Sequence, residues 1–422
     1  MKTTETNGQG RWHIWAVAGI ALAAGLVVVL LFRRQSLVDN IGDPYDYGKI
    51  AHGFVSEGFT KVTRRAASLY PSFLSLIFGL GGGNSAVQVI QCLLHAGTCS
   101  LVYVMGRRWF NPRSGLLAGL FCAVHPMLLR YVPDLHMETW LTFFFTLTVW
   151  SAMRFYDRPS VGNGVLLGAL GTITTLSKGI ALPVLAAYGV FWLYRSWKRA
   201  PGSAKSLPGV LAMSITIAVM IAPWTYRNYA VSGHVVLLTP GTPDAFLRGY
   251  IFTRTEFATL QRPPYTDAEN ESNQLFKRLA KENGDVWEED EIKDDVNNSR
   301  EMKRMIREHP FLTVRKVVVG LFTFWYEMTS LRNSLVPFTL AIGSWTLAVL
   351  GMRRAYREAR PFFVLLLSIV TVNAFVALLI PLGRYSVPVL PTLAVLAGFG
   401  ADTLLSRRSQ RAAASAPPPV SA

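Results

Sequence analysis

Residues 14–32 read IWAVAGIALAAGLVVVLLF, an apolar run with no charged side chain. About 20 consecutive apolar residues are needed for a helix to cross the hydrocarbon core of a bilayer. The run exceeds the apolar core of a signal peptide, and Arg33-Arg34-Gln35 follows it instead of a small-residue cleavage site. It therefore predicts a retained transmembrane helix.

Similar runs recur along the whole chain of 422 residues, which is 51% hydrophobic and only 16% charged. Such a composition is typical of membrane proteins. We predict an all-α membrane protein with about ten transmembrane helices, interfacial helices and a small, mostly helical outer insert. The predicted spans are residues 13–32, 85–105, 114–130, 138–155, 161–176, 179–195, 208–225, 334–352, 361–382 and 386–405.

The connecting segments indicate the orientation, because short cytoplasmic loops carry an excess of Lys and Arg. With the N-terminus inside, these residues concentrate in alternate loops around residues 107–113, 154–158, 195–205 and 353–360. The apolar stretch 311–326 carries Arg315 and Lys316, and counting it as a further crossing would move the 353–360 cluster outside. We therefore assign it to the membrane interface. Both termini are predicted to be cytoplasmic in a multi-pass protein of the cell (inner) membrane.

This topology divides the chain into four parts. Residues 1–226 form an N-terminal transmembrane catalytic module, whose outer loop 33–83 carries a candidate base. Residues 227–333 form the outer-face insert with the interfacial helix 311–326, and residues 334–406 form the C-terminal transmembrane helices. Residues 407–422, rich in Ala, Pro and Ser near their end, are predicted to be a disordered cytoplasmic tail.

The net charge of +16 indicates an anionic partner. Because the Lys and Arg residues lie mainly between apolar runs, membrane lipid headgroups are the expected partners and nucleic acid is not. The chain contains no GxxxxGK[ST] loop, HExxH, GxSxG or paired CxxC motif. These absences disfavour nucleotide-driven transport and zinc hydrolysis.

Carboxylates occur at two places on the predicted outer face. In the first loop, Asp43 and Asp46 lie beside Tyr47, an arrangement that suits a general base but also fits a solvated interfacial loop. Glu138 lies at the start of a predicted membrane helix. An acid there either has a partner or a functional role, or is simply stabilised by the positive end of the helix dipole. Asp134 and His136 precede it, but no second His or Cys with ligand spacing accompanies them, which disfavours a metal site.

Three basic residues lie at predicted outer helix ends: Lys178, Arg227 and Arg384. Each of them alone could extend its charged end to lipid headgroups. Together they contradict the usual shortage of basic residues on that face, and they therefore predict an anionic ligand. A phosphate carried on a membrane lipid would arrive at this depth, and guanidinium groups suit phosphate.

Short motifs, in this order, resemble the GT-C superfamily of integral-membrane glycosyltransferases. The likeness is to the bacterial branch related to protein O-mannosyltransferases and lipid A aminoarabinose transferases, and it spans nearly the whole chain. The motifs are Asp43-x-x-x-Tyr47-x-x-x-Ala51, Tyr70-Pro71-Ser72-Phe73, Glu138-Thr139, Leu176-Ser177-Lys178-Gly179, Pro223-Trp224-x-x-Arg227-Asn228-Tyr229, Gly233-His234, Gly249, His309-Pro310-Phe311 and Arg384-Tyr385-x-x-Pro388-x-x-Pro391.

The resemblance implies a role for each candidate residue. Asp43 would be the base that takes the acceptor proton, and Glu138 would orient the acceptor or that base. Lys178, Arg227 and Arg384, with Tyr385, would bind the donor phosphate. The supports for the acceptor or for the first loop would be Tyr47, Arg64 and His136.

The sequence departs from the family pattern in three ways. Pro44 follows Asp43 where many relatives have a second acid, so the base could instead be Asp46. Ser177-Lys178-Gly179 replaces a common Arg-Pro, and lysine lacks the two-pronged guanidinium geometry. The large outer domain of some relatives is absent, so the acceptor cannot be carried over from them.

The predicted function is therefore an inverting hexosyl or pentosyl transferase. It would move a sugar from a polyprenyl-phosphate donor to a hydroxyl of a glycan, lipid or protein acceptor, with the active site on the periplasmic or extracellular face. No cofactor is expected to be required, because the leaving group is a lipid monophosphate that basic side chains can stabilise. Participation of a divalent cation is left open. The alternatives are a transporter or flippase for a lipid-linked glycan, an oligosaccharide ligase or polymerase, and a catalytically inactive relative.

Overall fold

The computed structural model describes residues 9–32, 43–56, 69–200, 206–254, 264–328 and 331–414. These residues are predominantly helical and contain no β-strand. The predicted all-α membrane class is confirmed.

Each predicted span corresponds to helical structure. The spans are α1 (Gln9–Phe32), α4 (Asn84–Trp109), α5 (Pro112–Ala123) with α6 (Pro126–Leu129), α7 (Glu138–Asp157), α8 (Val161–Ser177), α9 (Ala181–Trp197), α10 (Ser206–Ser232), α15 (Leu331–Arg357), α16 (Phe363–Leu378) and α17 (Leu390–Ala414). Within the described residues, five segments are long and apolar enough to cross a membrane by themselves: Trp12–Phe32, Asn84–Trp109, Ser206–Ser232, Arg332–Arg357 and Gly383–Gln410.

Proline explains where two of the predicted spans are interrupted. The span 114–130 breaks before Pro126, because a residue that precedes proline avoids the α conformation. The span 386–405 begins with a 3₁₀ helix, η2 (Gly383–Val389), which contains Pro388, and regular α-helix starts only at Leu390. The predicted tail begins at residue 407, and α17 continues to Ala414 through Arg and Ala residues with high helix propensity.

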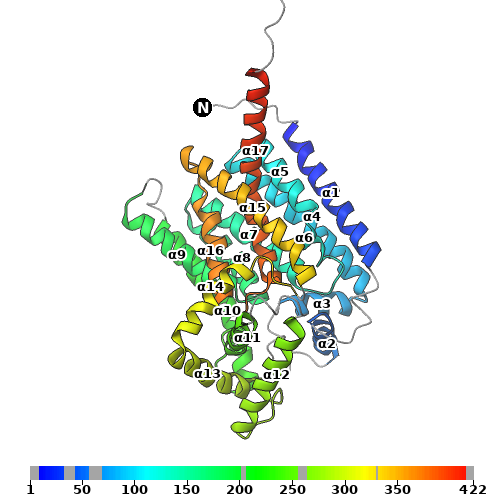
Figure 1. The fold of residues 1–422 in the computed structure, drawn as a ribbon, viewed down its shortest axis with the longest axis vertical. Coiled ribbons are helices and arrows are strands. Elements are labelled where there is room, and N and C mark those ends of the chain that lie inside the picture. Colours follow the sequence, from blue (N-terminus) through cyan, green and yellow to red (C-terminus); the bar gives the residue numbers. More distant parts are fainter. Residues whose placement is uncertain are drawn as a thin grey trace, which may run out of the picture.

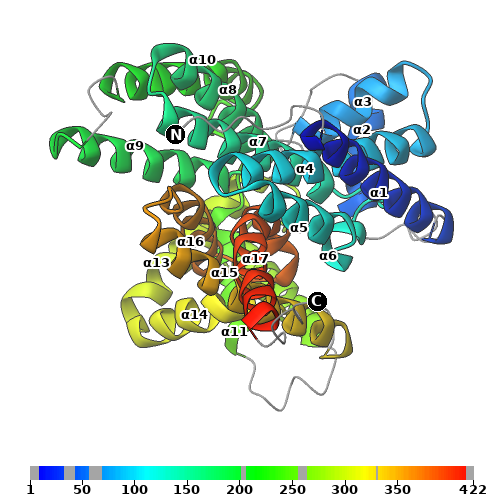
Figure 2. The same ribbon diagram turned by 90° about the horizontal axis from the view of Figure 1, so that it is seen from above.

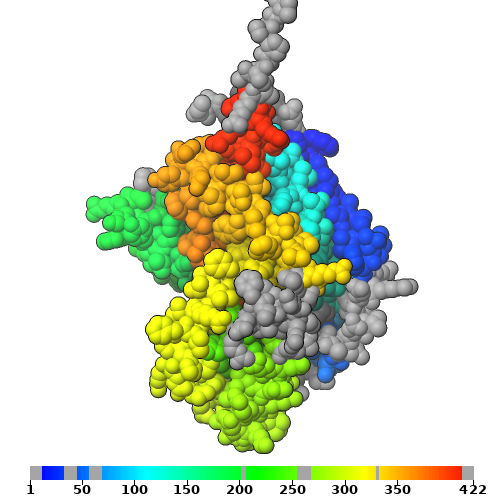
Figure 3. Space-filling model, viewed as in Figure 1, coloured from blue at the N-terminus to red at the C-terminus, as the bar shows by residue number. Residues whose placement is uncertain are grey.

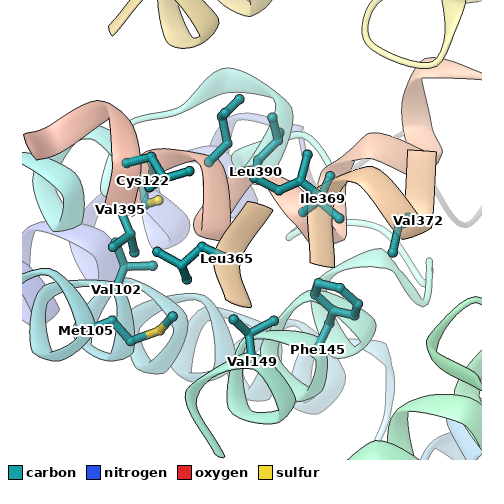
Figure 4. Close-up of a cluster of buried hydrophobic side chains, with 14 of the residues drawn as sticks. Val102, Met105, Cys122, Phe145, Val149, Leu365, Ile369, Val372, Leu390 and Val395 are labelled. Carbon is teal, nitrogen blue, oxygen red and sulfur yellow. The ribbon is translucent and has the colours of Figure 1, made fainter. Parts of the chain in front are cut away.

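The central core lies between α4, α5, α7, α16 and α17. Figure 4 shows aliphatic, aromatic and sulfur-containing side chains from these five helices meeting in one cluster. Its labelled members are Val102 and Met105 of α4, Cys122 of α5, Phe145 and Val149 of α7, Leu365, Ile369 and Val372 of α16, and Leu390 and Val395 of α17.

Glycines allow two helix pairs to approach closely. A Cβ built on Gly351 of α15 would overlap the carbonyl oxygen of Leu396 in α17, and one on Gly400 of α17 would overlap that of Leu347 in α15. Similarly, a Cβ on Gly164 of α8 would collide with the backbone of Gly209 in α10. Small residues at such crossings are typical of helices packed in membranes.

A buried carboxylate fixes one end of the bundle. Asp402 of α17, 4% exposed, accepts hydrogen bonds from Asn111 (3.0 Å) and Arg354 (2.9 Å), and Arg113 lies 3.7 Å away. Arg108 and Asp157 pair at 3.0 Å where α4 and α7 end.

The remaining helices lie at the opposite end, which we call the insert end. They are α2 (Asp43–Ser56), α3 (Leu69–Gly79), α11 (Thr242–Arg254), α12 (Pro264–Glu282), α13 (Glu291–Glu308) and α14 (Pro310–Thr323). Figure 1 shows α11–α13 grouped beneath the bundle, whereas the start of α1 and the end of α17 lie at the other end. Figure 2, seen from above, shows α17 near the middle of the bundle. In Figure 3 the insert forms the lower part of the face in view.

The contact between α15 and α17 generates a stability prediction. Gly351→Ala should destabilise the protein by about 1–3 kcal/mol, because the added methyl group has no room against α17. Gly343→Ala is the matched control on the same helix, since nothing lies within 4 Å of its Cβ position. The measurement is thermal unfolding in detergent, and equal melting temperatures for the two variants would contradict the packing.

Candidate functional site

The first loop packs against the start of α7 at the insert end. Tyr47 of α2 is buried and lies edge-on to Tyr70 of α3, with 5.6 Å between ring centroids. Both rings belong to an apolar cluster that includes Leu135 and Met137, directly before α7. The N-terminus of α2, where Asp43 and Asp46 lie, is thereby tied to the segment that precedes Glu138.

The candidate bases differ in how far the structure describes them. Asp43 is the first residue of α2, but its side chain lies outside the described residues, as does all of Arg64. Asp46 is half-buried in the first turn of α2. The structure therefore does not choose between the two aspartates.

Two glutamines of α4 fix the turn between α6 and α7. Gln88 donates to the carbonyl of Pro133 (2.8 Å), and Gln91 donates to those of Val132 (2.9 Å) and Asp134 (2.7 Å). Gln91 also accepts a hydrogen bond from the hydroxyl of Tyr70 (3.1 Å). This network joins the first loop to the turn that leads into Glu138.

Glu138 is a buried acid with unused hydrogen-bonding capacity. It is 3% exposed, and its Oε2 atom has no hydrogen-bond partner within the described structure. A buried carboxylate oxygen without a donor is costly, so such an atom indicates a place where a ligand can donate. Thr139 Oγ1 is also buried without a hydrogen-bond partner.

Opposite charges meet around Tyr131. Burial and then Glu138 raise the pKa of Tyr131, whereas Arg384 and Arg130 act to lower it. Burial also raises the pKa of Asp134, against the opposing effect of His136. Tyr131 is therefore close enough to both Glu138 and Arg384 for their charges to act on its hydroxyl.

Lys178 and Arg384, both predicted to bind phosphate, meet at Tyr385. Lys178 Nζ lies 3.9 Å from the centroid of the Tyr385 ring, and the Arg384 guanidinium carbon lies 5.0 Å from it. Arg384 also donates to the Tyr385 hydroxyl (3.0 Å). We call these three residues the cation–tyrosine cluster.

A hydrogen bond joins this cluster to the start of α7. Trp140 Nε1 donates to Ser177 Oγ (2.9 Å), and Ser177 directly precedes Lys178 at the end of α8. Phe73 of α3 packs on Trp140, with 4.5 Å between ring centroids. The first loop, Glu138 and Lys178 consequently form one connected arrangement.

Arg227 lies in an adjoining cluster at the end of α10. Its guanidinium carbon lies 5.2 Å from the Trp224 ring, and it donates to Asn228 (3.0 Å). Trp224 and Asn228 donate to the carbonyl of Leu238 (2.8 and 3.1 Å), and the Leu238 side chain reaches the backbone beside Gly179. Leu238 thus connects this cluster to the residue after Lys178.

His136 lies between an acid and an aromatic ring. Its Nδ1 is 3.7 Å from an Asp134 carboxylate oxygen, and its ring is edge-on to Tyr131 at 5.5 Å. Among the described residues, no three His, Cys, Asp or Glu side chains are grouped so that they could hold a metal ion.

Sequence reasoning missed several members of this arrangement. Tyr131, Trp140 and Gln91 connect the acidic and basic parts of the site, but each lies in or beside an apolar run where such a residue looks like ordinary packing. A polar Gln in α4 at membrane depth was the one available signal, since buried polar groups in membrane helices need partners.

Together, the all-helical membrane bundle and the joined acidic and basic side chains at one end define the class as an all-α membrane protein with one polar site. The family model described as dolichyl-phosphate-mannose-protein mannosyltransferase matches residues 67–226. The matched segment includes Glu138 and Lys178 and ends just before Arg227. The resemblance predicted from the motifs is therefore confirmed.

Solved structures agree on the fold. The archaeal oligosaccharyltransferase AglB from Archaeoglobus fulgidus, in complex with an inhibitory peptide and a dolichol-phosphate, is similar over 99% of this chain and 53% of its own, with a TM-score of 0.60 and 15% identity. The apo form of the oligosaccharyltransferase from the same organism has a TM-score of 0.59 and 14% identity. The match covers 99% of this chain and 54% of that one. This chain thus spans about half the length of these structures.

A weaker match is ArnT from Cupriavidus metallidurans bound to undecaprenyl phosphate, with a TM-score of 0.41 and 15% identity over 98% of this chain and 82% of its own. No curated protein matches the sequence. The family model matches one continuous part of this chain, and the two oligosaccharyltransferase structures share its fold.

The cation–tyrosine cluster generates a binding prediction. Tyr385→Leu should weaken binding of a short-chain polyprenyl phosphate about tenfold, because each lost cation–π contact is worth about 0.5–2 kcal/mol. Tyr385→Phe keeps the ring and should weaken binding of the polyprenyl phosphate only a few-fold. Titration of the purified protein in nanodiscs measures both, with Tyr194→Leu, an exposed aromatic of α9, as control. Identical affinities for Tyr385→Leu and wild type would contradict the role of the ring.

Proposed function

We propose that this protein is an integral-membrane glycosyltransferase that moves a hexose or pentose from a polyprenyl-phosphate donor to a hydroxyl acceptor, with inversion. The observation that carries the proposal is the position of Lys178 and Arg384 on one tyrosine ring. It is joined by a buried Glu138 at the start of α7, the helix whose Trp140 binds Ser177 next to Lys178. Dolichol-phosphate in the complex of the AglB protein supports a lipid phosphate as the ligand class.

The donor phosphate would bind at the cation–tyrosine cluster. Lys178 contributes a compact ammonium charge, and Arg384 contributes a planar guanidinium group that can bind two phosphate oxygens. Arg227 approaches from the adjoining α10 cluster. As the bond between the anomeric carbon and the phosphate oxygen breaks, negative charge grows on the leaving phosphate, and these fixed cations stabilise it.

The acceptor would approach from the side of the first loop. Asp43 or Asp46 takes the hydroxyl proton while the acceptor oxygen attacks the anomeric carbon opposite the departing phosphate, which inverts the configuration. The unpartnered Oε2 of Glu138 accepts a hydrogen bond from the acceptor or positions the first-loop base. Tyr47 and His136 support this side, and Arg64 is assigned there from sequence alone.

The site would face the periplasm or the extracellular space, with both termini in the cytoplasm. This proposal rests on the Lys and Arg residues concentrated at the end opposite the insert end. Residues 1–226 would supply the catalytic module, 227–333 the insert and 334–406 the last spans. Since basic side chains stabilise the leaving group, the reaction needs no cofactor, and a divalent cation could still assist. The acceptor could be a glycan, a lipid or a protein.

Transfer assays separate the candidate bases. With radiolabelled sugar on native membrane lipid as donor, Asp43→Asn and Arg384→Ala should lose transfer by a factor of about 100 or more, while Asp46→Asn should remain active. All variants are compared at matched expression. Loss of sugar transfer in Asp46→Asn alone would show that Asp46, and not Asp43, is the base.

Three other outcomes would overturn the proposal. Wild-type rates in all three variants would remove the site assignment. Movement of lipid-linked sugar across vesicle membranes without transfer would instead indicate a flippase. Transfer of an intact oligosaccharide, but not of a single sugar, would indicate a ligase or polymerase.

Glu138 provides a prediction for the acceptor side. Glu138→Gln keeps the shape but replaces one acceptor oxygen with an NH₂ group, so kcat/KM should fall about 10–100-fold. Binding of polyprenyl phosphate without acceptor should change less than threefold, because the phosphate contacts Lys178 and Arg384 instead. Comparable losses in phosphate binding and in transfer would show that Glu138 acts on the donor site.

A further inference from the structure

The insert and the phosphate-binding segment share their apolar cores. Leu379, just after α16, packs with Phe246, Leu247 and Phe276 of the insert. Further along, Leu382 forms a cluster with Ile251, Phe252 and Ala268, and Ile380 and Tyr385 pack against this cluster. The Tyr385 ring that contacts Lys178 and Arg384 thus also lies against the insert.

A buried lysine makes the polar part of this contact. Lys316 of α14 is 2% exposed, donates from Nζ to the carbonyl of Leu378 at the end of α16, and lies 4.2 Å from the centroid of the Phe246 ring. Burial lowers the pKa of Lys316 to about 7. The last carbonyls of a helix lack intrahelical partners, and a side-chain donor there satisfies one of them. Lys316 therefore caps α16.

The backbone of the insert holds the same segment at two further points. A Cβ on Gly249 of α11 would collide with the carbonyl oxygen of Leu379, so only glycine allows this approach. After α14, the carbonyl of Glu327 accepts a hydrogen bond from the Gly383 amide (2.6 Å). The chain from Leu378 to Gly383 is thus held by the insert at both of its ends.

We propose that Lys316 is a positioning residue for the phosphate-binding segment, so that the insert sets the location of Arg384 and Tyr385 through the capped end of α16. The inference rests on the proposed function for its meaning in catalysis. In sequence, Lys316 looked like a cation at the membrane interface beside Arg315. The structure separates the two, because Arg315 is exposed while Lys316 is buried between α11 and the end of α16.

The test compares Lys316→Met with Arg315→Met in the full-length protein in nanodiscs. Methionine keeps the unbranched apolar chain of lysine but leaves the Leu378 carbonyl without its donor. Amide hydrogen exchange of residues 379–389 should become at least tenfold faster in Lys316→Met, and affinity for a short-chain polyprenyl phosphate should fall about tenfold. Arg315→Met should match wild type in both measurements.

A second variant keeps the test decisive if Lys316→Met does not fold. Phe246→Leu removes the ring that Lys316 Nζ faces but keeps most of the apolar volume. It should speed amide exchange of residues 379–389 and weaken polyprenyl-phosphate binding, each by a few-fold. Unchanged exchange in residues 379–389 for the folded variants would overturn the proposal. Faster exchange with unchanged polyprenyl-phosphate affinity would also overturn it.

The two proposals fail in different ways. If the wild-type protein does not bind polyprenyl phosphate, the proposed function fails. The exchange comparison still decides whether Lys316 holds the segment, because it needs no ligand.

Discussion

Two cations placed on one aromatic ring are the constraint on which the rest of the site depends. Lys178 directly follows α8 and Arg384 lies in η2, and both contact the ring of Tyr385. Like charges repel, and the repulsion is stronger where the bundle excludes water. The surrounding structure must therefore fix both residues: Ser177 is bound by Trp140, and Gly383 is bound by Glu327. An arriving phosphate relieves the repulsion, which makes the cluster suited to binding an anion and to stabilising it as it leaves.

The acidic side of the site is built separately and joined to the basic side by aromatic residues. Gln88 and Gln91 hold the turn before α7, which places Glu138 at the mouth of the bundle. Tyr131 experiences Glu138 and Arg384 together. In the proposed function, this separation keeps Glu138 and the first-loop aspartates on the acceptor side apart from the cations that would stabilise the leaving phosphate. The insert completes the arrangement, because its core includes Leu382 and Tyr385.

How much of this could be predicted depends on whether the signal is local. The transmembrane helices were predictable because each is a continuous apolar run, and the break before Pro126 follows from proline itself. Lys178 and Arg384 could be grouped because basic residues at those helix ends are unexpected. The hydrogen bond between Trp140 and Ser177 and the burial of Lys316 depend on which helices become neighbours, and no local pattern carries that information. The Ala, Pro and Ser residues at the end of the chain favour disorder, whereas the Arg and Ala residues before them have high helix propensity and continue α17 to Ala414.

The most direct test of the central claim is an experimental structure of the protein in lipid nanodiscs with a polyprenyl phosphate bound. The account predicts phosphate oxygens about 2.7–2.9 Å from nitrogen atoms of both Lys178 and Arg384, with both side chains still in contact with the Tyr385 ring and the prenyl chain leading into the membrane. A phosphate bound elsewhere, with the cation–tyrosine cluster unchanged and out of its reach, would contradict it.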